Sequence, residues 1–136
     1  MLKQIETTLR DRGIQPSAQR VAVASYVLQT HEHPSAELVF RRVREHFPWI
    51  SRATVYNTLN LFVEKGLLQK LTIAEDSVVF DPITATHHHF IDEATGAIHD
   101  VPWERVQVCN IESLQDYEVE HYQVVMRGKL RKTGEK

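Results

Sequence analysis

The chain has 136 residues, of which 42% are hydrophobic and 25% are charged, and its formal net charge is −2. This composition is typical of a soluble protein. The length accommodates one or two small domains that would each be marginally stable alone, which favours oligomerisation. The sequence has no apolar run near the roughly 18 residues that a membrane span requires, and residues 1–6 lack the apolar core of a signal peptide. We therefore expect a cytoplasmic protein with no membrane association.

The charge distribution and the cysteine content limit the kinds of binding site that the chain can form. Residues 1–80 carry 10 Lys and Arg against 8 Asp and Glu, a net charge of +2. Residues 81–136 carry 6 against 10, a net charge of −4, so a mildly basic first part precedes an acidic second part. Cys109 is the only cysteine, which excludes an intrachain disulfide and a zinc site built from several cysteines of one chain.

Apolar periodicity and capping residues predict four helices in the first half of the chain. The predicted helices span Lys3–Arg12, Ala18–Gln29, Ala36–Phe47 and Arg52–Lys65. A serine precedes each of the last three helices, where its side chain would accept a hydrogen bond from the first turn: Ser17, Ser35 and Ser51. Gly13 and Gly66 follow the first and the fourth helix, and glycine readily adopts the left-handed backbone that ends a helix.

Two short strands, Leu67–Thr72 and Ser77–Phe80, are predicted to form a hairpin around a polar turn at residues 74–76. Helices followed by a hairpin occur in this order in a winged helix-turn-helix, whose recognition helix enters the major groove of DNA. Candidate DNA contacts are polar or cationic side chains on the second and fourth helices: Arg20, Ser51, Arg52, Thr54, Tyr56 and Asn57. The alternative is a helical domain whose polar face meets only water.

Three adjacent histidines mark the second part of the sequence. If they lie on a strand, His87 and His89 share one face about 7 Å apart and His88 points to the other face. Two carboxylates bracket this strand, Asp81 before it and Asp100 after it. Two imidazoles with two carboxylates suit a divalent metal such as Fe²⁺, Mn²⁺ or Zn²⁺. The alternative is a polar edge strand whose histidines are solvated.

The remaining elements predict a small α/β unit. The histidine strand, Thr86–Ile91, is expected to pair with a strand over Ala97–Val101. A helix from residue 102 or 103 to about 114 and a strand over Val119–Met126 complete a β-β-α-β order. The sequence contains no Gly-rich phosphate loop and no nucleophile elbow.

Four segments together resemble the ferric uptake regulator superfamily, and the match covers nearly the whole chain. They are residues 15–20 (Gln-Pro-Ser-Ala-Gln-Arg), residues 33–37 (His-Pro-Ser-Ala-Glu), residues 51–59 (Ser-Arg-Ala-Thr-Val-Tyr-Asn-Thr-Leu), and the histidine strand with Gly96 and Asp100. The resemblance implies an α+β fold in which a winged-helix DNA-binding domain, residues 1–81, is followed by a hinge, residues 82–86, and a metal-binding α/β dimerisation domain, residues 87–136. It also implies a homodimeric transcriptional repressor that binds a palindromic operator in double-stranded DNA.

The resemblance further implies a regulatory metal between the two domains, held by His33, Asp81, His87, His89 and Asp100. Fe²⁺ or Mn²⁺ is the implied ion, and Zn²⁺ is the implied substitute. One ion with ligands from both domains stabilises only conformations in which the domains are close. Its binding would therefore bias the relative orientation of the two winged helices of a dimer, and so the fit to two DNA half-sites.

The sequence departs from the family at its cysteine positions. Many members hold a structural zinc with two Cys-x-x-Cys pairs, but here Asp92 and Thr95 stand where the first pair would be. We therefore expect no cysteine-bound structural zinc. The dimer would be held by packing and by sheet pairing instead.

A second metal site of the family is only partly represented. His88 and His121 match positions that ligate there in other members. Other ligands of that site are replaced, and Glu104 or His99 would have to stand in for them. These four residues form the candidate second metal site.

Two features favour peroxide as the signal. Asp100 is the shorter acid that peroxide-stress regulators carry where iron-uptake regulators usually carry Glu, and cysteine-free forms occur among those regulators. The implied mechanism is the reaction of peroxide with site-bound Fe²⁺, which oxidises a ligand imidazole, that of His33 or His89, and so releases the metal and the DNA. Such a sensor reacts once and is not an enzyme.

Other functions stay open at this point. The triple histidine and the lack of structural cysteines also resemble iron- or haem-responsive regulators of iron homeostasis. A plain ferrous or zinc sensor would use the same ligands. Outside regulation, two histidines and a carboxylate form the facial triad of non-haem iron enzymes, and a metal-buffering protein would need the ligands alone.

Overall fold

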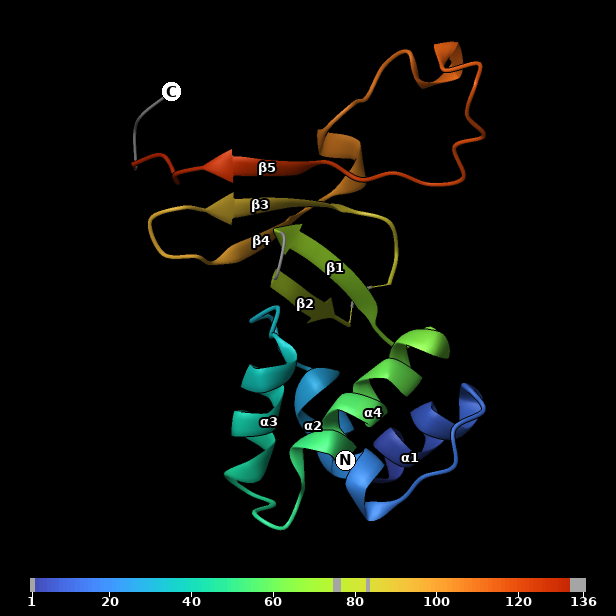
Figure 1. Ribbon diagram of the computed structural model, residues 1–136, viewed down its shortest axis with the longest axis vertical. Helices are drawn as coiled ribbons and strands as arrows, with labels where there is room; N and C mark the ends of the chain where they lie inside the picture. Colours follow the sequence, from blue (N-terminus) through green and yellow to red (C-terminus); the bar gives the residue numbers. More distant parts are fainter. Residues whose placement is uncertain (1, 75–76, 83, 133–136) are drawn as a thin grey trace. The chain divides into compact units, whose positions relative to one another are not determined.

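Figure 1 shows the computed structural model of the chain, which describes residues 2–74, 77–82 and 84–132. The chain divides into two compact units, Met1–Thr84 and Ala85–Lys136. This boundary falls at the predicted hinge, of which residue 83 is outside the described residues. The limits of the two domains and of the hinge stay a prediction of the sequence. None of the described helices is both long and apolar enough to cross a membrane.

The first unit begins with four helices: α1 (Leu2–Asp11), α2 (Ala18–Val27), α3 (Ala36–Arg44) and α4 (Arg52–Glu64). All four predicted helices are confirmed, although α2 and α3 end earlier than expected. The serine caps form as predicted. In each, the hydroxyl oxygen accepts a hydrogen bond from the backbone N–H three residues later, in the pairs Ser17–Arg20, Ser35–Leu38 and Ser51–Thr54. Each cap satisfies a backbone donor that has no partner within the helix, so the serines fix where these helices start.

The core of the first unit is formed by apolar side chains from all four helices. On α4 the buried side chains Val55, Leu59 and Phe62 recur at the spacing of one helix face. Leu9 of α1 and Val39 of α3 are fully buried in the same cluster. Burying a side chain of this size stabilises the fold by about 1.5–3 kcal/mol relative to exposure. The cluster therefore fixes the loops and helix ends that carry the candidate functional residues of this unit.

A hairpin follows α4 and completes the winged-helix order. Strand β1 (Gln69–Ala74) pairs antiparallel with β2 (Ser77–Asp81). The turn predicted between them includes residues 75–76, which are outside the described residues. Asp81 ends β2 opposite Gln69 and is only 1% exposed. An acidic side chain is thus buried at the open end of the hairpin.

The second unit is built on a three-stranded sheet, which Figure 1 shows in the order β4-β3-β5. Strand β3 (His88–Asp92) pairs antiparallel with β4 (Ile98–Val101) and parallel with β5 (Val125–Gly128). The chain turns between β3 and β4 at Gly96, whose φ of 79° lies in the left-handed region that favours glycine. The histidine strand and its antiparallel partner are therefore confirmed, although the strand begins at His88 rather than at Thr86, and His87 lies just before it.

The helix predicted from residue 102 or 103 to residue 114 is wrong. In this stretch, all of which is described, the chain forms only two short 3-10 helices, η1 (Trp103–Arg105) and η2 (Ile111–Ser113). Between them Val106 is extended, with φ −131° and ψ 127°, and Asn110 is left-handed, with φ 70°. A β-branched valine favours extended backbone and asparagine tolerates the left-handed region, so these two residues interrupt the expected helix.

The last strand is shorter than predicted. It was expected over Val119–Met126 but covers Val125–Gly128. Just before it, the Val124 carbonyl accepts a hydrogen bond from the His89 N–H at 3.0 Å, as a ladder carbonyl would. The Val124 N–H, however, donates to Nδ1 of the His88 ring at 2.9 Å. A side-chain nitrogen replaces a backbone acceptor there, and regular pairing begins only after it.

Candidate functional site

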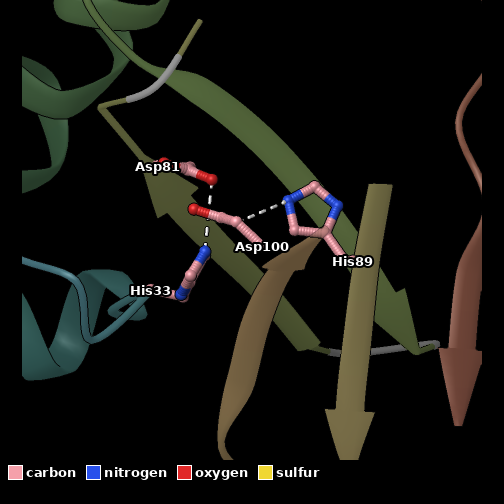
Figure 2. Close-up of side chains that lie close together, drawn as sticks. All are labelled: His33, Asp81, His89 and Asp100. Carbon is pink, nitrogen blue, oxygen red and sulfur yellow. Dashed lines mark ion pairs between the residues drawn. The ribbon is translucent and has the colours of Figure 1, made fainter. Parts of the chain in front are cut away.

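One candidate half-site lies in the first unit, where His33 faces Asp81 (Figure 2). The His33 Nε2 and Asp81 Oδ2 atoms are 3.2 Å apart, and the two side chains are 4% and 2% exposed. His33 lies in the loop between α2 and α3. The Phe80 N–H donates to the Pro34 carbonyl at 2.9 Å and so ties the hairpin to this loop. A buried carboxylate needs a cation or a proton beside it, so this pair has the chemistry of two metal ligands.

The second candidate half-site lies in the second unit, where two histidines converge on Asp100. The strand register sets His89 on β3 opposite Asp100 on β4. The Nε2 atoms of His87 and His89 lie 3.1 and 3.4 Å from the same carboxylate oxygen, Oδ1 of Asp100, and Figure 2 shows the His89 contact. The two imidazole rings have centroids 4.5 Å apart. Strand alternation and strand pairing thus assemble three potential ligand atoms within this unit alone.

The tautomer of His87 decides what its ring offers to an ion. Its Nδ1 atom lies 2.6 Å from the Ala85 carbonyl oxygen. Because a carbonyl oxygen can only accept, Nδ1 carries the hydrogen, and the lone pair of the neutral ring is on Nε2. That lone pair faces the Asp100 carboxylate at 3.1 Å. Two acceptors this close repel each other unless a proton or another cation lies between them, so the contact is either an ion pair with a protonated imidazole or a pair of ligands for one cation.

His88 lies on the other face of β3 and is fully buried. Its Nδ1 accepts the hydrogen bond from Val124, and its ring stacks on Trp103 with centroids 4.7 Å apart and planes 14° apart. Since Nδ1 is an acceptor, the neutral ring carries its hydrogen on Nε2, which has no hydrogen-bond partner among the described residues. In this arrangement neither ring nitrogen of His88 offers a lone pair to a metal.

The other members of the candidate second metal site are exposed, unlike His88. His99 on β4 is exposed, and its ring centroid is 6.2 Å from that of Phe90. Glu104 in η1 and His121 before β5 are exposed as well. Within residues 2–74, 77–82 and 84–132, none of these four side chains belongs to a group of three or more ligand atoms that could share an ion. The second metal site therefore stays a prediction of the sequence.

The candidate DNA contacts gather at the start of α4 and beside it on α2. Ser51 Oγ accepts from the Thr54 N–H at 3.1 Å and donates to Thr54 Oγ1 at 2.9 Å. Tyr56 is 40% exposed, and Asn57 is exposed next to it. Arg20 donates to a backbone carbonyl of the preceding loop at 2.8 Å. A polar hollow of about 220 Å³ in this region is lined by Gln19, Arg20, Thr54, Asn57, Thr58 and Leu61.

Arg52, the first residue of α4, has a partner that the sequence analysis did not identify. Its Nε and Nη2 atoms donate to the two carboxylate oxygens of Glu37 on α3, each at 2.9 Å. Its guanidinium also lies over the Phe40 ring, 4.6 Å from the centroid. Glu37 and Arg52 are 15 positions apart in the sequence and on different helices, so no helical spacing reveals the pair.

Comparison with known proteins adds independent findings. The model of the ferric uptake regulator family matches residues 11–127 of the chain. The peroxide-responsive repressor PerR of Staphylococcus aureus is 31% identical over 137 residues, an alignment that covers 99% of this chain and 93% of the relative. Both matches include α2, α3 and α4 of the first unit and the histidine strand of the second.

Two solved structures share the fold. The ferric uptake regulator of Vibrio cholerae has a TM-score of 0.68 at 22% identity, covering 92% of this chain and 98% of its own. The peroxide stress regulator of Campylobacter jejuni has a TM-score of 0.67 at 23% identity, covering 98% of each chain. These likenesses confirm the predicted α+β fold, a winged-helix domain followed by a smaller α/β domain. The chain therefore belongs to the ferric uptake regulator family, whose members are metal-responsive regulators.

Proposed function

We propose that the chain is a metal-dependent, homodimeric repressor of transcription that binds a palindromic DNA operator and responds to peroxide. In this proposal the two half-sites, His33 with Asp81 and His87 and His89 with Asp100, share one Fe²⁺ or Mn²⁺ ion, for which Zn²⁺ can substitute. The observation that carries the proposal is the convergence of two imidazole nitrogens on one oxygen of Asp100. The relative from S. aureus is named as a repressor, which supports a regulator rather than an enzyme.

The donor set fits a divalent first-row metal. Three imidazoles and two carboxylates differ from the all-oxygen sets that Mg²⁺ and Ca²⁺ prefer, and Cys109, the only cysteine, provides no thiolate cluster. The hydrogen bond from His87 Nδ1 to the Ala85 carbonyl fixes the ring so that its Nε2 faces Asp100. Such an outer contact is the usual way in which proteins orient a metal-binding histidine. The proposed dimer contains no cysteine-bound structural zinc.

The response to peroxide would depend on the ligand imidazoles. Bound Fe²⁺ would activate peroxide so that one of its oxygen atoms is transferred to a ligand imidazole and the other leaves as water, whereas Mn²⁺ is far less reactive towards peroxide. His33 and His89 are the imidazoles that the family resemblance assigns to oxidation. A ring that gains an oxygen atom becomes a weaker metal ligand because its nitrogens acquire amide character. The two metal half-sites then no longer share an ion. The winged helices of the dimer therefore no longer fit the two halves of a palindromic operator.

The DNA interface of the proposal is the start of α4 together with α2. Tyr56 and Asn57 present exposed polar side chains at positions suited to base edges and phosphates. Arg20 contributes positive charge for phosphate contacts, and Arg52 does so when a phosphate displaces Glu37 as its partner. Ser51 caps α4 and thereby fixes the direction in which this helix starts.

Operator binding before and after peroxide tests the proposal. Operators are first selected from random duplexes with Mn²⁺-loaded protein under anaerobic conditions. Affinity and intact mass are then measured for the Fe²⁺ and Mn²⁺ forms before and after one equivalent of peroxide. We expect the Fe²⁺ form alone to lose DNA affinity and to gain one oxygen atom, mapped to His33 or His89. His46→Ala, which changes an exposed histidine outside the half-sites, is the matched control and should behave as wild type.

Other results would redirect the assignment. If both metal forms survive peroxide unmodified and DNA affinity follows only free metal or added haem, the chain is a regulator of iron or haem status. If neither Fe²⁺ nor Mn²⁺ changes the affinity for DNA, or if the chain turns over a substrate, the repressor proposal fails.

A further inference from the structure

The loop that carries His33 holds this residue in an unusual backbone conformation. His33 has a φ of 50°, in the left-handed region, although it is neither glycine nor at the end of a helix. Residues with a side chain visit this region at an energetic cost, so the surrounding contacts must hold it there. The conformation matters because His33 Nε2 faces Asp81 Oδ2 at 3.2 Å, and a relaxed backbone would carry the ring elsewhere.

Glu32, the residue before His33, is anchored to both flanking helices. Its Oε1 accepts a hydrogen bond from the Tyr26 hydroxyl on α2 at 3.0 Å. Its Oε2 accepts from Arg42 Nη2 on α3 at 3.1 Å. Its backbone N–H donates to Thr30 Oγ1 at 3.1 Å. Both carboxylate oxygens and the backbone of one residue thus fix the N-terminal side of His33.

The residues after His33 are fixed as well. The Pro34 carbonyl accepts from the Phe80 N–H at 2.9 Å, next to Asp81. Ser35 caps α3 through the Leu38 N–H. A change of φ at His33 would therefore have to break either the Glu32 contacts or the Pro34 contact. The Pro34 contact is a backbone hydrogen bond, which a side-chain substitution does not remove. The contacts of the Glu32 side chain can be removed by mutation, so they are the restraint that can be tested.

We infer that Glu32 is a positioning residue that holds His33 in its ligand conformation and so sets the metal affinity of the site without touching the ion. This inference rests on the proposed function, since it concerns the same metal. An ordinary surface ion pair would be expected to leave metal affinity unchanged. Arg42 offers an internal comparison, because its Nη1 atom also lies 3.7 Å from Oε1 of Glu45, the residue that follows α3.

The test is the Mn²⁺ affinity of the full chain, measured by calorimetry under anaerobic conditions. Glu32→Gln keeps the shape of the side chain but cannot accept from both partners as a carboxylate does. We expect its Kd to rise about fivefold, the size of effect that a partly exposed charged contact can supply. Tyr26→Phe should weaken binding about twofold, since a single hydrogen bond is lost. Glu45→Gln, the matched control, should bind Mn²⁺ as wild type does.

Two readouts separate positioning from general destabilisation. The thermal unfolding midpoint of the metal-free variants should stay within about 3 °C of wild type, as expected for a surface substitution. Combining Glu32→Gln with Arg42→Gln should weaken binding no more than Glu32→Gln alone, because Arg42 acts on the loop through its contact with Glu32. Unchanged Mn²⁺ affinity in Glu32→Gln, or a loss matched by Glu45→Gln, overturns the inference while leaving the metal site standing. If wild type itself binds no Mn²⁺, the proposed function fails and the inference falls with it.

Discussion

Arg52 and Glu37 form a bidentate ion pair that joins the start of α4 to α3, with both donor–acceptor distances at 2.9 Å. The hydrogen bond from Arg52 lowers the pKa of Glu37, and the same contact raises the pKa of Arg52. Both groups therefore stay charged in the pair. A cation assigned to DNA from the sequence is thus already engaged by a carboxylate of its own chain.

Removing the charge of Glu37 should strengthen binding to any duplex. In Glu37→Gln the guanidinium of Arg52 loses its carboxylate partner and becomes available to a phosphate. We expect severalfold tighter binding to a non-operator duplex at low salt, and a salt dependence steeper by about one phosphate contact. Fluorescence anisotropy over a series of salt concentrations measures both quantities.

Glu64→Gln is the control for this change, because it removes one negative charge at the opposite end of α4. It should shift affinity less than Glu37→Gln does. Equal effects of the two variants would mean that net charge, rather than release of Arg52, governs binding.

The same ion pair predicts a pH dependence of stability. The folded state holds the pKa of Glu37 below its ordinary value of 4.5, chiefly through the hydrogen bond from Arg52. A group with a depressed pKa stabilises the fold above its ordinary value and loses that contribution as pH falls through the depressed value. The difference in urea unfolding midpoint between wild type and Glu37→Gln should therefore be constant near neutral pH and shrink in acid. A pH of about 3 lies well below the ordinary pKa of a glutamate carboxyl. A difference in unfolding midpoint that stays unchanged down to that pH would contradict this account.

The elements that sequence predicted well are those specified by neighbouring residues. Ser17, Ser35 and Ser51 precede apolar repeats, and local cap chemistry places each helix start correctly. The Glu37–Arg52 pair could not be predicted in this way, because it depends on how α3 packs against α4. The network around Glu32 was missed for the same reason, since its partners come from two different helices.

In the second unit, the strand pattern was predicted correctly but the segments after β4 were not. Alternation along β3 correctly separates His88 from its two neighbours, because the period of a strand is set by backbone geometry. The helix expected after β4, from residue 102 or 103 to about 114, does not form, because Asn110 in the left-handed region breaks it. Nothing in the local pattern indicated that His88 would be buried against Trp103, which is a contact between segments distant in sequence.

The histidine strand predicts different outcomes for neighbouring substitutions. His89→Ala removes a ring nitrogen that faces Asp100, and it should abolish tight Mn²⁺ binding. His88→Asn should leave Mn²⁺ stoichiometry unchanged, because neither nitrogen of that ring offers a lone pair to an ion. It should instead lower the unfolding free energy by about 1–3 kcal/mol, since the buried hydrogen bond to Val124 and the Trp103 stack are lost. Equilibrium dialysis and urea unfolding check the two effects, and loss of a second Mn²⁺ equivalent in His88→Asn would instead establish the second site.

Tyr56 should affect DNA without affecting metal. Its side chain is 40% exposed on α4, outside both half-sites. We expect Tyr56→Ala to weaken operator binding by about tenfold, the cost of roughly one good contact to a base or phosphate. Mn²⁺ affinity should not change. A parallel loss of Mn²⁺ affinity would refute the separation of the DNA-contacting residues from the metal ligands.

Ser51 allows the cap of α4 to be separated from any contact that its hydroxyl makes with DNA. Its Oγ accepts from the Thr54 N–H at 3.1 Å, so Ser51→Ala leaves that donor without its cap and should cost about 1 kcal/mol of unfolding free energy. Ser51→Asn retains a neutral capping oxygen and should restore stability. If Ser51→Asn also restores operator affinity, the serine acts by setting the start of α4. If stability returns but affinity does not, the hydroxyl itself contacts DNA, and its role is one of recognition as well as capping.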